Sequence, residues 1–202
     1  MDKQKLIEQI VQYEWEAFHN APNEGGPAYC QNDFETFEIM RLSQYRPWPE
    51  ELLESWLADL QAAAERGWNV MTEKYARMEE SLDPLRYAEI KPLLPVRSDM
   101  HRAIAEQIVQ IQVGWMEELA AQYPKFAGRA RNIHTSQDSR MGTSYETYLR
   151  AELGTYSDAT LKLYGRFIIE LYRAGENLAK QIMTHTALLY GYAGLDDAEN
   201  AL

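Results

Sequence analysis

The sequence predicts an all-α protein, and three observations favour this fold class. Apolar residues recur at spacings of three and four along nearly the whole chain, as on the buried face of a helix. No stretch alternates polar and apolar residues for long enough to predict a β-strand. Several short motifs also occur twice, in the same order, on helical patterns. We therefore expect one compact domain over residues 1–202, with about eight to ten helices.

Four helices are expected in the first half of the chain. The first runs from about 2 to 19, and Asp2 is suited to its N-cap. The loop that follows, 20–32, contains two prolines and two glycines, so we expect no helix there. The second helix covers about 32–45, because the prolines after it cannot continue a helix.

The third helix begins at Pro49, since proline is tolerated at the first helical position. It is expected to end at Gly67, because glycine readily adopts the left-handed conformation of a helix C-cap. A fourth helix follows over about 68–81. The stretch 83–97 contains three prolines, and we expect it to connect the two halves, with a short helix at 86–91.

The second half is predicted to repeat this order of elements. Ser157 is suited to an N-cap, and Pro124 ends the long helix that precedes it in the chain. The expected helices cover about 98–123, 144–153, 157–175 and 176–190, with a long loop at 123–143 and a short final helix within 195–202.

Three motifs shared by the halves suggest an internal duplication. They occur at 8–12 and 106–110, at 34–37 and 145–148, and at Gly67 and Gly175. The offset between copies is 98, then 111, then 108 residues, which loop insertions would produce. We expect two pseudo-symmetric four-helix repeats, about 1–82 and 98–190, around a pseudo-twofold axis. The alternative is that helical sequences reuse Glu, Gln, Leu and Ile by chance.

The composition disfavours several classes of partner. A net charge of −11 repels nucleic acid backbones, so we expect no nucleic acid partner. No run approaches the ~18 apolar residues of a membrane-spanning helix, so we expect no membrane partner. Cys30 is the single cysteine, which excludes a disulfide within the chain and is consistent with a cytoplasmic location.

Glu14 interrupts the apolar stripe of the first helix, between Ile10 and Phe18. The proposed repeat places a neutral residue, Gln112, at the corresponding position of the second half. A buried carboxylate without a partner has a raised pKa and can act as a general acid or base near neutral pH. Replacing such a Glu14 by Gln should abolish turnover and leave stability unchanged or higher. The alternative is that Glu14 reaches solvent or pairs with a structural arginine.

Lys74 interrupts the apolar face of the fourth helix in the same way. The proposed repeat places Ile182 at the corresponding position of the second half. A lysine there either extends along the helix to solvent or meets a buried anion, such as Glu14 or a ligand carboxylate. Glu14 and Lys74 are therefore the candidate acid–base pair. Three further side chains are candidates to bind an anionic group, although each arginine is equally suited to the surface: Arg41, Gln44 and Arg77.

The loop before the second helix is another candidate region. Its paired glycines allow backbone N–H groups to approach a ligand closely. The loop residues expected to contact substrate are Asn23, Glu24, Gly25, Gly26 and Gln31. Cys30 lies just before a helix, whose N-terminus lowers the pKa of a thiol, so it is a candidate nucleophile. A lone cysteine is also a common small packing residue.

No metal site is expected, and the sequence leaves the cofactor open. Glu16 and His19 have the Glu-x-x-His spacing of di-iron bundles, but no second such motif occurs. The single cysteine excludes a cysteine-based zinc site. Neither a phosphate-binding nor a dinucleotide-binding glycine motif is present.

Several stretches together resemble one known family. They lie at 23–26, 30–31, 34–41, 72–78 and 143–150, and include Thr-Glu-Lys-Tyr-Ala-Arg-Met and Thr-Ser-Tyr-Glu-Thr-Tyr-Leu-Arg. In these stretches the chain resembles an uncharacterised bacterial family, domain of unknown function 4125. The resemblance spans nearly the whole chain and implies a bacterial, cytoplasmic, helical protein. It implies no activity and no catalytic residues.

These observations favour a small-molecule site between the two halves. We expect binding of an anionic, amino-acid-like metabolite, with elimination, isomerisation or hydrolysis as the class of chemistry. The alternative is a non-catalytic interaction protein that acts as a homodimer. Its acidic composition and its many Tyr and Trp residues favour that second hypothesis.

Overall fold

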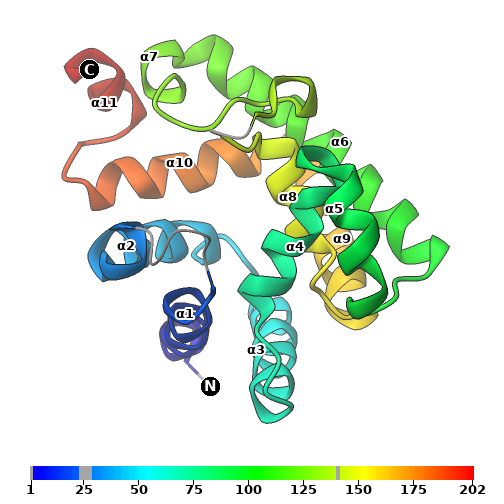
Figure 1. The fold of residues 1–202 in the computed structure, drawn as a ribbon. Helices are drawn as coiled ribbons and strands as arrows, with labels where there is room; N and C mark the ends of the chain where they lie inside the picture. Colours follow the sequence, from blue (N-terminus) through cyan, green and yellow to red (C-terminus); the bar gives the residue numbers. More distant parts are fainter. Residues whose placement is uncertain (1, 23–28, 140–141) are drawn as a thin grey trace.

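The computed structural model describes residues 2–22, 29–139 and 142–202, and within them the fold is all-α (Figure 1). These residues form eleven α-helices and three short 3-10 helices. The β-structure of the described residues is one isolated bridge, between Ser139 and Gly142. The predicted fold class is confirmed. The helix count exceeds eight to ten because three short helices of four to seven residues accompany the eight main ones.

The eight main helices lie within two residues of their predicted ends. They are α1 (Lys3–His19), α2 (Phe34–Tyr45), α3 (Glu50–Glu65), α4 (Val70–Leu82), α6 (Asp99–Gln122), α8 (Tyr145–Leu153), α9 (Asp158–Ala174) and α10 (Leu178–Leu189). Pro49 is the N-cap of α3 and not its first residue, because its ψ of 152° is extended. Gly67 and Gly175 both follow their helices with positive φ, at 66° and 71°, as expected of glycine at a helix end.

The connecting segments contain the shorter helices. The connector holds α5 (Pro84–Ile90) and η2 (Lys91–Leu93), so the short helix predicted there is confirmed. The second loop holds α7 (Pro124–Ala127) and η3 (Thr135–Gln137), and α11 (Leu195–Ala201) packs on α7 and α10. The prediction of no helix in the first loop is wrong at its end. There η1 (Tyr29–Asn32) forms a single turn, which needs only one i→i+3 bond.

The helices pair in a reciprocal order. Within the halves, α1 packs against α2, α3 and α4, and α6 packs against α8, α9 and α10. Between the halves, α4 packs on α8, α10 packs on α2, and α3 packs on α9. Each pairing has a counterpart if the second four helices repeat the first four. This is the order that a pseudo-twofold arrangement requires, and the duplication itself stays a prediction.

Two asparagine N-caps make equivalent contacts in the two halves. The Asn69 side chain donates to the carbonyl of Ala17 at 2.8 Å, and the Asn177 side chain donates to the carbonyl of Trp115 at 3.0 Å. Each asparagine therefore joins the start of the last helix of its half to the first helix of the same half. A buried backbone carbonyl needs such a donor, so these two bonds stabilise the packing of each half.

The core is continuous across the two halves. At its centre five large aromatic side chains pack together, namely Tyr45, Trp48, Trp56, Tyr156 and Tyr164. The ring centroids of Trp48 and Tyr164 are 5.0 Å apart, and those of Trp56 and Tyr156 are 4.6 Å apart. The halves thus share one apolar interior. Across the described ranges, every helix is too short or too polar to cross a lipid bilayer.

Candidate functional site

Four ionisable side chains are buried together between the halves. Glu14 lies on α1, Arg41 on α2, Lys74 on α4 and Glu152 on α8, and their exposed fractions are 2%, 7%, 2% and 7%. Charged groups avoid the protein interior unless they are paired and hydrogen-bonded. Two carboxylates and two cations balance one another here, and we call these four residues the buried charge network.

The Glu14 carboxylate occupies one end of this network. Its Oε1 accepts hydrogen bonds from the Tyr45 hydroxyl at 2.6 Å and from the Trp56 indole at 3.1 Å. Its Oε2 faces Arg41 Nε at 3.1 Å in an ion pair whose geometry is not that of a hydrogen bond. Burial and then the nearby Glu14 charge raise the pKa of Tyr45, so its hydroxyl stays protonated and donates. The arginine pairing considered for Glu14 is therefore present.

Arg41 and Gln44 join the two carboxylates. Arg41 Nη1 donates to Gln44 Oε1 at 2.8 Å and lies 3.8 Å from Glu152 Oε2. The Gln44 amide then donates to Glu152 Oε1 at 2.7 Å. Burial would raise the pKa of the Glu152 carboxyl, but Lys74 and Arg41 outweigh it and hold that pKa below its usual value. Glu152 is thus an anion at neutral pH.

Lys74 and Tyr148 form the other end. Lys74 Nζ donates to the Tyr148 hydroxyl at 2.7 Å and lies 3.4 Å from Glu152 Oε2. Arg41 Nη2 also donates to that hydroxyl, at 3.4 Å. Burial would raise the pKa of Tyr148, but the charges of Lys74 and Arg41 outweigh burial and lower it. The hydroxyl of Tyr148 therefore lies between two cations, and this side chain is only partly buried.

The predicted acid–base pair lies within one network, but its members do not pair with each other. Glu14 pairs with Arg41, whereas the buried anion beside Lys74 is Glu152. The sequence interpretation did not include Glu152 or Tyr148. The proposed repeat could have indicated both, because an offset of 111 aligns Glu152 with Arg41 and Tyr148 with Phe37. At both aligned positions the second half has a polar side chain where the first half has a different residue type.

Gln112, which the proposed repeat aligns with Glu14, is also buried among aromatic hydrogen-bond partners. It is 2% exposed, and its amide donates to the Tyr164 hydroxyl at 3.0 Å. The Tyr145 hydroxyl donates to its Oε1 at 3.2 Å. The Tyr164 hydroxyl also lies 3.3 Å from Gln112 Oε1, to which it can donate, and Tyr164 aligns with the donor Trp56 at an offset of 108. One half thus has a charged buried centre and the other a neutral one.

The remaining predicted residues lie outside the network. Arg77 turns to another face of α4, where Nη2 donates to Glu73 at 2.7 Å and to the Pro95 carbonyl at 2.8 Å. Gln31 is buried and its amide donates to the carbonyls of Phe18 and Ala21, so it fixes the loop to the end of α1. Cys30 is exposed in η1. Four candidates lie outside the described residues, namely Asn23, Glu24, Gly25 and Gly26.

Tyr75 follows Lys74 on α4, and Lys74 Nζ lies 5.9 Å from the centroid of its ring. Burial raises the pKa of Tyr75, and the Lys74 charge opposes that shift. In the part of the chain that the structure describes, no three His, Cys, Asp or Glu side chains lie close enough to share a metal ion.

Comparisons with known proteins identify a family for this chain. Neither the curated proteins nor the solved structures include a significant match. One family model matches residues 4–200, which is almost the whole chain. The chain therefore belongs to the family described as "Protein of unknown function (DUF4125)".

Proposed function

We propose that this protein binds a small anionic, amino-acid-like metabolite at the Tyr148 end of the buried charge network. The observation that carries the proposal is the Tyr148 hydroxyl, which accepts from Lys74 Nζ at 2.7 Å and from Arg41 Nη2 at 3.4 Å. The hydroxyl of a half-buried tyrosine, held by two buried cations, is suited to exchange a proton with a ligand that reaches it. Its donors are themselves fixed by Glu152 and Gln44, so the geometry is preorganised.

Positive charge around Tyr148 supports an anionic ligand. Besides Lys74 and Arg41, the guanidinium of Arg131 lies 4.7 Å from the centroid of the Tyr148 ring. Arg131 is exposed and comes from the second long loop, so it can reach a ligand at the surface. Three cations thus lie around one ring. Glu14 and Glu152 balance Arg41 and Lys74, which leaves the charge of Arg131. A ligand carboxylate would compensate the rest.

The chemistry that these groups support is proton transfer. In its ionised form Tyr148 accepts a proton from the substrate and becomes neutral, and Lys74 stabilises the ionised form by donating to it. The same tyrosine can return the proton to the product or to a leaving group. A lyase, isomerase or hydrolase acting on an amino-acid-like anion fits this cycle. Glu14 then acts indirectly, by holding Arg41 in place.

The first test is a titration of the tyrosines in the native protein. One tyrosine is expected to ionise below the usual pKa of 10.0, because Lys74 and Arg41 lower the pKa of Tyr148. Near-ultraviolet absorbance recorded against pH measures this step, and Tyr148→Phe should remove it. Tyr145→Phe is the matched control, because burial raises the pKa of Tyr145. If both variants keep the early step, Tyr148 is not the acid–base group.

The second test concerns the ligand. A panel of amino acids, 2-oxo acids and N-acyl amino acids is added to the protein, and the midpoint of thermal unfolding is measured. A binding anion must raise this midpoint, because it binds only the native state. Arg131→Glu should abolish the increase, whereas Arg129→Glu, an exposed change on the same loop, should retain it. An increase that is equal in both variants would place the ligand elsewhere.

A specific observation favours the second candidate function, a non-catalytic interaction protein acting as a homodimer. Four apolar side chains of the connector region are largely exposed, namely Leu85 (83%), Leu93 (74%), Val96 (93%) and Met100 (67%). Exposed apolar side chains concentrated in one segment are a feature of contact sites. Sedimentation of the wild type and of Val96→Glu distinguishes the candidates, because only a dimer through this surface would dissociate in the variant.

We also infer that the two halves arose by duplication and that the protein works in the bacterial cytoplasm. The reciprocal helix pairs and the equivalent Asn69 and Asn177 bonds support the duplication. The single cysteine is consistent with a reducing compartment. Superposition of 1–82 on 98–190 in an experimental structure tests the first inference.

A further inference from the structure

A second site lies on another face of the α4–α8 pair. Here the connector, α4, α6 and α8 enclose a pocket of about 820 Å³, within the range typical of small-molecule sites. Arg77 and Ser81 of α4 line it, together with Thr147 and Ala151 of α8. Lys74 and Glu152 are on the same two helices but point into the buried charge network. The pocket is therefore distinct from the Tyr148 site, and we call it the connector pocket.

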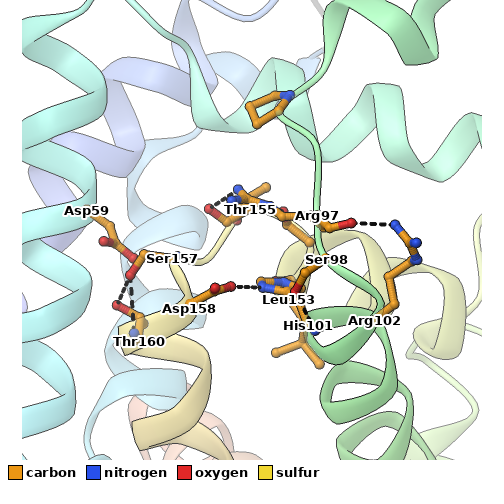
Figure 2. Close-up of polar contacts among 12 residues, drawn as sticks. Asp59, Arg97, Ser98, His101, Arg102, Leu153, Thr155, Ser157, Asp158 and Thr160 are labelled. Carbon is orange, nitrogen blue, oxygen red and sulfur yellow. Dashed lines mark hydrogen bonds and ion pairs between the residues drawn. The ribbon is translucent and has the colours of Figure 1, made fainter.

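Polar contacts fix the connector against the turn between α8 and α9, as Figure 2 shows. Arg97 Nε donates to the Gly154 carbonyl at 2.7 Å, and Nη2 donates to the Thr155 carbonyl at 3.2 Å. Arg102 donates to the backbone carbonyl of Arg97. These bonds hold the wall of the connector pocket in place before any ligand arrives.

His101, near the start of α6, makes further contacts with the same wall. It is 2% exposed, with Nδ1 at 2.8 Å from Asp158 Oδ1 and Nε2 at 3.1 Å from the Leu153 carbonyl. The side-chain hydrogen bond from His101 lowers the pKa of Asp158, so Asp158 is a carboxylate and can only accept. These two contacts orient the His101 ring and join the start of α6 to the end of α8 and the start of α9.

The lining combines cations with apolar surface. Its charged members are five cations and two carboxylates, namely Arg77, Lys91, Arg97, Arg102, Arg150, Glu80 and Glu106. The apolar members include Tyr87, Leu94, Pro95, Ala105 and Ala151. Arg102 also pairs with Asp99, and Arg150 pairs with Glu106 and Glu146, so Lys91, Arg77 and Arg97 are the cations that mainly attract an anion. Such a concentration attracts anions to a concave, partly apolar site.

At the inner wall of the connector pocket, the buried Glu73 carboxylate lies beside two guanidinium groups. Glu73 Oε1 accepts from Arg77 Nε at 2.9 Å, and Arg97 Nη2 lies 3.5 Å from the same oxygen. The other oxygen accepts from the Trp68 indole. Burial lowers the pKa of Arg97; Glu73 opposes that shift, and the nearby Arg77 charge adds to it. Two guanidiniums thus share one buried carboxylate, with smaller contributions to Arg97 from Asp158 and Asp59. An anionic ligand would add to this balance.

We propose that the connector pocket binds an organic anion with an apolar body, such as an aromatic carboxylate, sulfonate or phosphate ester. The anionic group faces Arg77, Arg97 and the exposed Lys91 and Arg102 at the rim. The apolar body covers Tyr87, Leu94 and the small side chains of α6 and α8. A free inorganic anion lacks this second part, so it binds more weakly than an organic anion of equal charge.

Anilinonaphthalene sulfonate tests this site, because it joins one sulfonate to aromatic rings and its fluorescence rises in apolar surroundings. Folded wild-type protein is expected to bind it saturably at one site. The double variant Lys91→Glu and Arg102→Glu should weaken binding by about tenfold or more, because two attractive charges become repulsive. Both residues are exposed, and Arg102 loses only its bond to the Arg97 carbonyl and its pairing with Asp99, so the fold is expected to be retained, which circular dichroism checks. Inorganic phosphate should compete only weakly.

Two matched controls locate the effect. Arg166→Glu reverses an exposed charge on α9, away from the pocket, and should leave the affinity within about twofold. Phenylnaphthylamine, the same ring system without the sulfonate, should bind wild type and double variant alike. Equal sulfonate affinity in wild type and double variant, or no saturable binding to the folded protein, overturns the proposal.

Discussion

Replacing Glu14 by Gln is expected to lower the free energy of unfolding by about 3–5 kcal/mol. The loss follows from Arg41, which is 7% exposed and has Glu14 Oε2 at 3.1 Å from its Nε. The variant leaves that guanidinium with Glu152 at 3.8 Å as its remaining carboxylate. The amide group that replaces the carboxylate has one oxygen. If its nitrogen faces Arg41, two N–H donors oppose each other; if its nitrogen takes the other position, Tyr45 and Trp56 lose their acceptor. Urea unfolding of the two proteins measures the difference.

Two variants show whether charge pairing causes this loss. Adding Arg41→Met to Glu14→Gln should recover most of the stability, because the unpaired buried cation is then absent and Lys74 still balances Glu152. Glu16→Gln makes the same chemical change at an exposed position of α1 and should cost no more than about 0.5 kcal/mol. If Glu14→Gln costs as little as Glu16→Gln, the carboxylate does not hold Arg41.

The sequence alone gives the opposite expectation for this variant, because it does not show the partner. Glu14 was identified by its place in an apolar stripe, which is local information. Its pairing with Arg41 depends on how α1 packs on α2, and no spacing within one helix encodes that packing. Helix ends, in contrast, were predictable to within two residues, because prolines, glycines and cap residues act within a few positions of the chain.

Arg77 shows how a local pattern can also mislead. It follows Lys74 by three residues, a spacing that favours neighbouring positions on a helix. However, three residues rotate the helix by 300°, so the two side chains diverge by about 60°. Glu73 lies four residues before Arg77, and this ion-pair spacing was the better guide. Gln31 was selected for its loop position, and its actual role, two bonds to the end of α1, is a tertiary contact.

The charge network was predictable in part. The sequence predicts Glu14 and Lys74 at inward positions and Arg41 and Gln44 as candidates to bind an anion, and the structure brings the four together. Glu152 and Tyr148 complete the set from the second half. Their helix looks like an ordinary amphipathic surface helix when read alone. Comparing each half with the other, position by position, was the method that could have found them.

Two buried tryptophans allow the energy of the hydrogen bond to Glu14 to be measured separately from that of aromatic packing. Trp56→Phe is expected to cost about 1.5–3 kcal/mol more than Trp48→Phe. Both side chains are almost fully buried, at 2% and 0% exposed, and the change of shape is the same. Trp56 Nε1, however, donates to the Glu14 carboxylate at 3.1 Å, whereas Trp48 Nε1 has no acceptor among the described residues.

The difference arises from the group that loses its partner. In Trp56→Phe a buried carboxylate loses a donor, and hydrogen bonds to charged groups are among the strongest in proteins. In Trp48→Phe the lost N–H was already unsatisfied, so its removal offsets part of the cost of the cavity. Adding Glu14→Gln to each variant should reduce the difference to the ~1 kcal/mol of a neutral hydrogen bond. Equal losses in the two single variants would show that packing, and not the carboxylate, sets the contribution of Trp56.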